Sequence, residues 1–232
     1  MNNNMKNVAS TNSIGLEIYD PSITYHVSVT NGNTKLGKGI PSISLPVGLT
    51  CNPEAPCFKY CYATRGNMAF KPVKNCYRRN LFAYQQNPKL YFSEIAAKTT
   101  LFRMVRWNAA GDIPDVGYLK GMVWVAKKNP HTLYLAFTKQ YKIVNEYMNH
   151  AHKLPKNLRI VFSTWLDWVP ENPYSFPTTW VRFPENTKKN KEMYAACNAM
   201  IPKNAFQCTG SCPDCGQCWK AKKGESIVFK KH

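Results

Sequence analysis

The chain has 232 residues and a formal net charge of +18, from 31 basic and 13 acidic side chains. Its content of 44% hydrophobic and 13% aromatic residues excludes a disordered protein, and its length allows one main core with a small appendage at most. No apolar run approaches the length of a membrane span and no signal-peptide pattern follows the N-terminus, so we expect a cytoplasmic protein with no membrane partner.

Short β-rich runs alternate with helical stretches along the chain, which is the pattern of βα units around a parallel sheet. The predicted strands are residues 41–48, 101–115 (a strand running into a Gly-Asp turn), 131–139, 157–165, 178–184 and 225–231. The predicted helices are residues 75–86, 88–100, 115–130 and 141–153.

About six strands in this length favour an α/β fold of a particular kind, a partial or open (β/α)6-like barrel, with a flat doubly wound sheet as the alternative. We expect residues 1–34 to form an N-terminal tail and lead-in, with a loose first dozen residues. Residues 35–200 should form the barrel-like core, and residues 201–232 a C-terminal cysteine-rich, cluster-binding segment.

Functional groups gather at the carboxyl ends of the strands in both of these architectures. The cysteines of residues 51–61 follow the first predicted strand, and polar residues follow each of the next three. These are Asn108 and Asp112 after the second strand, Thr138 and Lys139 after the third, and Ser163, Thr164 and Asp167 after the fourth. We therefore expect four consecutive strand ends to face one mouth.

The loop "CNPEAPCFKYC" contains Cys51, Cys57 and Cys61, separated by five and then three residues. Structural zinc takes four protein ligands, whereas a four-iron cluster with three protein thiolates keeps one iron free for a small molecule. Three explanations fit the loop: zinc with a ligand from elsewhere, a closed cluster with Cys76 as fourth ligand, or a cluster with an open iron. The place of the loop at the mouth and the absence of a nearby histidine favour the open iron.

A second cysteine group, "CTGSCPDCGQCW", places Cys208, Cys212, Cys215 and Cys218 close together near the C-terminus. Zinc ribbons usually separate their two ligand pairs by a dozen or more residues, whereas compact runs with two-residue spacers are typical of ferredoxin-like cluster binding. This group therefore predicts a second four-iron cluster that is fully ligated by protein, with a compact zinc knuckle as the alternative. The isolated Cys197 is expected to be a buried hydrophobic residue.

The positive charge is densest around the first cysteine group, because residues 51–100 carry eight Lys or Arg against two acids. Such a field attracts polyanions, so nucleic acid or a phosphorylated substrate is the expected partner. A basic surface that only keeps the protein in solution is the alternative. The residues expected to contact nucleic acid are Arg65, Lys71, Lys74, Arg78 and Arg79.

The stretch "RWNAAGDIPD" places a small-residue turn before Asp112, which lets the carboxylate approach a ligand closely. From the local sequence alone, capping of the next helix by Asp112 or Asp115 is the simpler explanation. Asn108 follows the same predicted strand as Asp112, and Ser163 follows a nearby one. Both are therefore candidate cofactor-binding residues together with Asp112.

Several of these stretches resemble known families. "GKGIPSISLPVGLTC", "CFKYCYATRG", "RWNAAGDIPD" and "CPDCGQCW" are similar to a family of phage- and plasmid-borne proteins known by a numbered gene product, over about residues 35–225. The three-cysteine loop after the first strand, with Tyr60 before its last cysteine and a Gly-acid turn after the second strand, also resembles the radical S-adenosylmethionine superfamily. That superfamily usually spaces its cysteines by three and then two residues and has Gly-Gly-Glu at the turn.

The superfamily resemblance implies that Cys51, Cys57 and Cys61 hold a four-iron cluster, that S-adenosylmethionine chelates its open iron, and that Asp112 binds the amino group of this cofactor. The expected function is then that of an enzyme acting on a nucleotide or nucleic acid, with the C-terminal cluster as an auxiliary centre. The phage-type resemblance implies the host cytoplasm as its location. The alternative is a non-catalytic iron–sulfur or zinc protein that binds nucleic acid or a host factor through its basic surface.

Overall fold

The fold of the protein, seen in a computed structural model that describes residues 10–33, 36–37, 39–185 and 190–230, is built on one parallel sheet. Most of the expected loose tail lies outside these described residues. Seven strands are hydrogen-bonded in the order β1-β2-β3-β4-β5-β7-β6, and all neighbours are parallel. The strands are β1 (Ser42–Ile43), β2 (Met104–Trp107), β3 (Leu133–Thr138), β4 (Leu158–Ser163), β5 (Thr178–Arg182), β6 (Phe206–Gln207) and β7 (Ser226–Lys230).

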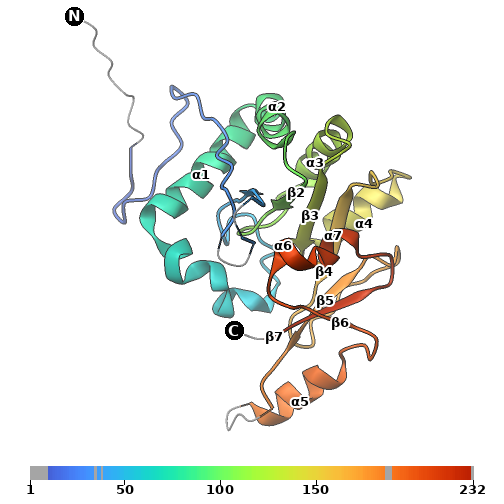
Figure 1. The fold of residues 1–232 in the computed structure, drawn as a ribbon. Helices are drawn as coiled ribbons and strands as arrows, with labels where there is room; N and C mark the ends of the chain where they lie inside the picture. Colours follow the sequence, from blue (N-terminus) through green and yellow to red (C-terminus); the bar gives the residue numbers. More distant parts are fainter. Residues whose placement is uncertain (1–9, 34–35, 38, 186–189, 231–232) are drawn as a thin grey trace, which may run out of the picture.

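The strand order runs in one direction from β1 to β5, so right-handed crossovers place the connecting helices on one face of the sheet. Figure 1 shows α1 to α4 following one another along this outer face, while α6 and α7 lie on the other side. The helices are η1 (Pro56–Tyr60), η2 (Tyr62–Thr64), η3 (Gly66–Ala69), α1 (Lys71–Gln86), α2 (Pro88–Thr99), α3 (Val116–Lys128), α4 (Tyr141–Asn149), α5 (Lys191–Ala199), α6 (Cys212–Cys215) and α7 (Gln217–Lys220).

The expected α/β fold with an open parallel sheet is confirmed. The described sheet has seven strands rather than about six, because β6 follows no alternating apolar pattern and was not predicted. The barrel-like curvature of the sheet stays a prediction.

The outer face carries the main core, because successive residues of a strand point to opposite faces. Val105 and Trp107 of β2 and Phe162 of β4 pack with the helices in this core. Helices α2 and α3 meet closely at Gly121, where an added Cβ would lie 2.0 Å from the ring of Phe92. The small residue therefore permits the approach that seals this side of the sheet.

The inner face is covered by the C-terminal segment instead of by crossover helices. Leu135 and Val161, which alternate with the outer residues of β3 and β4, pack with Trp219 of α7. The indole Nε1 of Trp219 donates to the carbonyl oxygen of Val105 at 3.1 Å. The second cysteine group is thus fixed against the inner face of β2, β3 and β4.

Most predicted elements are confirmed, and the differences have local causes. Strand β1 is only two residues long, because Pro41 and Pro46 bracket it and cannot donate to a ladder. Helix α1 begins four residues earlier than expected, at Lys71, because Pro72 fits the first turn of a helix. Helix α5 was not predicted, since only Cys197 of its residues is buried.

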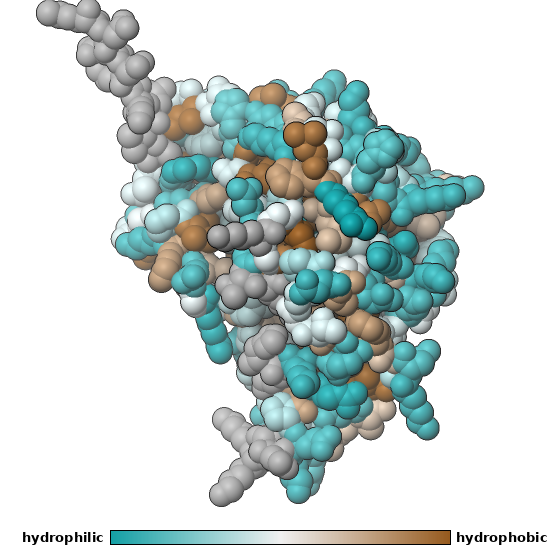
Figure 2. All heavy atoms as spheres, in the orientation of Figure 1, coloured by the Kyte–Doolittle hydropathy of each residue, from teal (hydrophilic) through white to brown (hydrophobic). Residues whose placement is uncertain are grey.

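The surface gives no sign of a membrane-spanning element: among the described residues, no helix combines the length and apolar character needed to cross a bilayer. The face shown in Figure 2 is largely hydrophilic, with hydrophobic residues in small separate groups.

Candidate functional site

The three-cysteine loop follows β1 and is built from short 3₁₀ turns. Pro56 starts η1, Cys57 lies within it, and Cys61 ends it and begins η2. Burial raises the pKa of the Cys51 thiol to about 11, and Asp112, Cys61 and Cys57 add to the rise. The three thiols of the loop therefore act on one another electrostatically.

A single metal ion and a four-iron cluster require different spacings between their thiolate ligands. Tetrahedral zinc with bonds of about 2.3 Å brings its thiolates to about 3.8 Å from one another. In the part of the chain that the structure describes, no three His, Cys, Asp or Glu side chains are grouped closely enough to hold an ion. A cluster binds each thiolate to a different iron and therefore accepts thiolates that lie farther apart. A donor set of thiols without histidine is one that a cluster can use, and with a fourth thiolate zinc can use it as well.

Cys76, the alternative fourth ligand, lies on α1. Its charge acts on its chain neighbour Tyr77 and on Arg79. Cys197 is buried, as expected for a packing residue.

Hydrogen bonds fix the loop to the carboxyl end of β3. The side chain of Asn52 donates to the carbonyl oxygen of Lys139 at 3.1 Å, and that of Gln140 donates to the carbonyl oxygen of Thr50 at 3.1 Å. The backbone N–H of Asp112 donates to the hydroxyl of Thr50 at 3.0 Å. The cysteine loop, the turn after β2 and the end of β3 therefore form one connected unit.

Asp112 is buried at the centre of this unit. Its Oδ1 accepts from the hydroxyl of Thr138 at 2.6 Å and from the N–H of Ile113 at 2.8 Å, and its Oδ2 accepts from the N–H of Lys139 at 2.8 Å. Burial raises the pKa of the Asp112 carboxyl, although these hydrogen bonds oppose the rise. The helix-capping role belongs to Asp115, which accepts from the N–H of Tyr118 at 2.7 Å at the start of α3.

Asn108 differs from Asp112 because its side chain has no partner. The residue directly follows β2 with a left-handed φ of 51° and is 3% exposed. Neither its amide nitrogen nor its amide oxygen forms a hydrogen bond. Buried polar groups are almost always paired, so an amide with both ends unpaired indicates a binding position for a ligand that offers a donor and an acceptor.

The stability of an Asn108→Gly variant tests this interpretation. An unpaired buried amide costs about 1–3 kcal/mol and glycine accepts the positive φ, so we expect the free energy of unfolding of the ligand-free protein to rise by about 1 kcal/mol. Asn80 is the matched control, because its buried amide is fully paired with Ser28 and Ser44. Asn80→Ala should destabilise the protein in the same urea titration, and an equal loss in Asn108→Gly would contradict the binding role.

The third and fourth strand ends join through Lys139. Its Nζ donates to the hydroxyl of Ser163 at 2.7 Å, and its charge opposes the burial that raises the pKa of the Cys57 thiol. Of the predicted strand-end residues, Asp112 and Lys139 are thus hydrogen-bonded to the segment that begins the cysteine loop, and Thr138 and Ser163 are hydrogen-bonded to these two residues. Thr164 instead donates to the carbonyl oxygen of Thr179, and the exposed Asp167 acts on Cys197.

The sequence did not reveal Arg106 as a residue of this region, although its charge and those of Cys212 and Cys218 act on one another. Its guanidinium is 7% exposed and sits 3.9 Å from the centre of the Phe137 ring. Burial lowers the pKa of Arg106, and Tyr62, Cys218, Cys212 and Asp112 oppose this effect. The alternation in "MVRW" could have revealed it, because it places Arg106 on the face opposite Val105 and Trp107.

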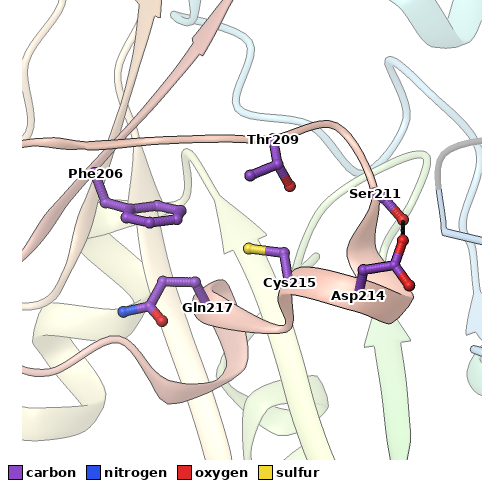
Figure 3. Close-up of a pocket in the computed structure, with 6 residues that line it drawn as sticks. All are labelled: Phe206, Thr209, Ser211, Asp214, Cys215 and Gln217. Atoms are coloured by element: carbon purple, nitrogen blue, oxygen red, sulfur yellow. Dashed lines mark hydrogen bonds between the residues drawn. The ribbon is translucent and has the colours of Figure 1, made fainter.

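The second cysteine group surrounds Cys218. Burial raises the pKa of its thiol to about 12, with added contributions from Cys208, Cys212 and Cys215 and opposition from Arg106. Figure 3 shows the Cys215 sulfur pointing from α6 toward Phe206 and Thr209, across an open pocket of about 390 Å³. The pocket is lined by Phe206, Thr209, Ser211, Asp214, Cys215 and Gln217.

The five basic residues predicted to contact nucleic acid fall into two groups. Arg79 forms a two-pronged ion pair with the buried carboxylate of Glu17, and Arg78 donates to the Glu17 carbonyl oxygen at 2.6 Å. These two hold the N-terminal segment against α1. Arg65, Lys71 and Lys74 are exposed.

Comparison with known proteins gives one match. The model of a protein family described as Gene product 88 matches residues 27–221, which include both cysteine groups and all of the mouth residues named above. No match was found among curated proteins or among solved structures.

Proposed function

Because the chain belongs to the Gene product 88 family, whose description states no activity, we propose its function from the geometry: an iron–sulfur enzyme of the radical S-adenosylmethionine type that acts on a nucleotide or nucleic acid. Two observations support the proposal: the thiols of Cys57 and Cys61 act electrostatically on Cys51 in the loop after β1, and the buried amide of Asn108, at the end of the neighbouring strand β2, has no partner. A cluster held by Cys51, Cys57 and Cys61 would supply an open iron at which S-adenosylmethionine can be reductively cleaved.

The residues of the mouth have distinct roles in this proposal. Asn108 offers a donor and an acceptor to the cofactor. Oδ2 of Asp112 accepts from the Lys139 N–H and keeps a lone pair for the amino group of the cofactor. The hydroxyl of Ser163 accepts from Lys139 and retains its own proton to donate.

The C-terminal cysteines would hold a second, fully ligated cluster, with zinc as the alternative metal. If all four thiols served as ligands, no ligand position would remain for a small molecule. Arg106 would offset part of the negative charge that thiolate ligands bring to the inner face. This site would serve as a structural or electron-transferring centre.

The proposed activity is tested by incubating reduced, cluster-loaded protein with S-adenosylmethionine and measuring 5′-deoxyadenosine. We expect product from the wild type and from Cys197→Ala, and none from Cys57→Ala. Circular dichroism would verify that each variant is folded. Absence of product from the reduced, cluster-loaded wild type would refute the enzymatic proposal.

A second candidate is favoured by the state of Asp112, since both of its carboxylate oxygens already bind the protein itself. In this candidate the metal sites only stabilise a non-catalytic protein that binds nucleic acid or a host factor. In this candidate, the role of Asp112 is to hold the ends of β2 and β3 together through its hydrogen bonds to Thr138 and Lys139. Asp112→Asn would then leave nucleic-acid affinity intact, and no cofactor would bind.

A further inference from the structure

The segment that carries the first cysteine group also exposes large aromatic side chains. Phe58 is 56% exposed, Tyr60 52% and Phe70 60%, although all three belong to or adjoin the short turns η1 to η3. We call these three residues the aromatic rim. Large apolar side chains that are exposed together on a protein surface often mark an interaction site.

Two of the three rim residues, Phe58 and Tyr60, contact other parts of the chain. The ring of Tyr60 stacks on Trp165, with ring centroids 6.0 Å apart and an angle of 28° between the planes. The ring of Phe58 lies over Gly48, where an added Cβ would approach it to 3.1 Å. One face of Tyr60 is thus fixed by a second ring, while about half of the side chain remains open to a ligand.

The charges around the rim are positive. Lys59 lies between Phe58 and Tyr60, and Lys71 directly follows Phe70; both lysines are exposed. No Asp or Glu occurs in the sequence between Glu54 and Glu94. A flexible polyanion with flat apolar groups along its length complements such a surface, whereas an acidic peptide supplies the charge without the rings.

We infer that the aromatic rim binds single-stranded nucleic acid, whose bases stack on Phe58, Tyr60 and Phe70 while its phosphates contact Lys59, Arg65, Lys71 and Lys74. This inference rests on the proposed function, because it names single-stranded nucleic acid as the substrate class of the proposed enzyme. A duplex hides the faces of its bases, so only a single strand can use the rings. The rim adjoins Cys57 and Cys61 in the chain, so a bound strand passes beside the loop thiols.

Binding is measured by fluorescence anisotropy of a labelled oligothymidylate on the anaerobically purified full-length protein. The wild type should prefer the single strand over a duplex of equal length, with log affinity falling against log salt at a slope of about −3 for four phosphate contacts. Tyr60→Ala should weaken binding roughly 5- to 100-fold, and Tyr60→Phe should restore most of the loss.

Matched controls separate the rim from the rest of the surface. Trp124→Ala removes a ring of similar exposure on α3, 45% exposed, and should leave affinity unchanged. Lys127→Ala should weaken binding less than Lys59→Ala does, because Lys127 lies on the last turn of α3 and not in the segment that carries the rim.

Two results would overturn the inference. The first is equal affinity for duplex and single strand with no response to Tyr60→Ala, which would indicate charge attraction alone. The second is equal competition by polyglutamate, which would assign the surface to an acidic protein. Because oligonucleotide binding is measured without S-adenosylmethionine, failure of the enzymatic proposal and failure of this inference give different results.

Discussion

Replacing Trp219 by alanine is expected to lower the free energy of unfolding by about 3–5 kcal/mol, the range for deleting a fully buried tryptophan. Trp219 is 4% exposed and is the largest side chain in the buried cluster between the C-terminal segment and the inner face of the sheet. Its indole N–H also binds the carbonyl oxygen of Val105. Among the described residues, the other buried members of that cluster are aliphatic, and the ring of Phe137 packs against it only partly buried.

The measurement is a urea titration followed by circular dichroism. Trp219→Phe keeps a ring and loses the indole hydrogen bond, so it should cost less, about 1–2 kcal/mol. Trp124→Ala, on the exposed side of α3, should change stability by about 0.5 kcal/mol or less. If Trp219→Ala were as mild as Trp124→Ala, the C-terminal segment would not be part of the core.

Replacing Cys57 by alanine is expected to remove about half of the iron, the part bound by the loop, and to abolish all chemistry that depends on S-adenosylmethionine. Cys215→Ala should remove the C-terminal metal instead and keep part of the cofactor-dependent signal. The reason is that Cys57 belongs to the loop group, where Lys139 and Cys61 act on its thiol, whereas Cys215 belongs to the second group and acts on Cys218. Iron and sulfide analysis with electron paramagnetic resonance of the reduced variants measures both effects.

Cys76→Ala and Cys197→Ala are the controls for that experiment. Both should keep the full metal content, since Cys197 is a buried residue of α5 and the charge of Cys76 acts on Tyr77 and Arg79. A loss of iron in Cys76→Ala equal to that in Cys57→Ala would show a fourth protein ligand. The loop cluster would then have no open iron.

The sequence predicted the part of the fold that repeats. Strands β2, β3 and β4 and helices α3 and α4 follow from apolar periodicity, because each buries one face or one stripe of side chains. The strand-end rule then brought Asn108, Asp112, Lys139 and Ser163 to one edge, since parallel strands end at the same side of a sheet. Hydrogen bonds to the cysteine loop are present for Asp112 and Lys139.

Contacts between residues far apart in the chain could not be predicted in the same way. Arg79 pairs with Glu17, and Trp219 with Val105, through hydrogen bonds that no local pattern encodes. Whether a polar side chain is satisfied is also invisible in the sequence. Asn108 and Asp112 were predicted together as ligand-binding residues, yet one amide is unpaired while the other residue's carboxylate accepts three hydrogen bonds.

The central claim is that two groups of thiols hold two clusters, of which one has an open iron. Anaerobic purification followed by iron, sulfide and zinc analysis tests it most directly. The account predicts about eight irons and eight sulfides per chain, and a spectrum of the reduced protein that changes when S-adenosylmethionine is added. Zinc at the loop cysteines, or clusters whose spectrum ignores the cofactor, would contradict it and leave the binding protein as the better description.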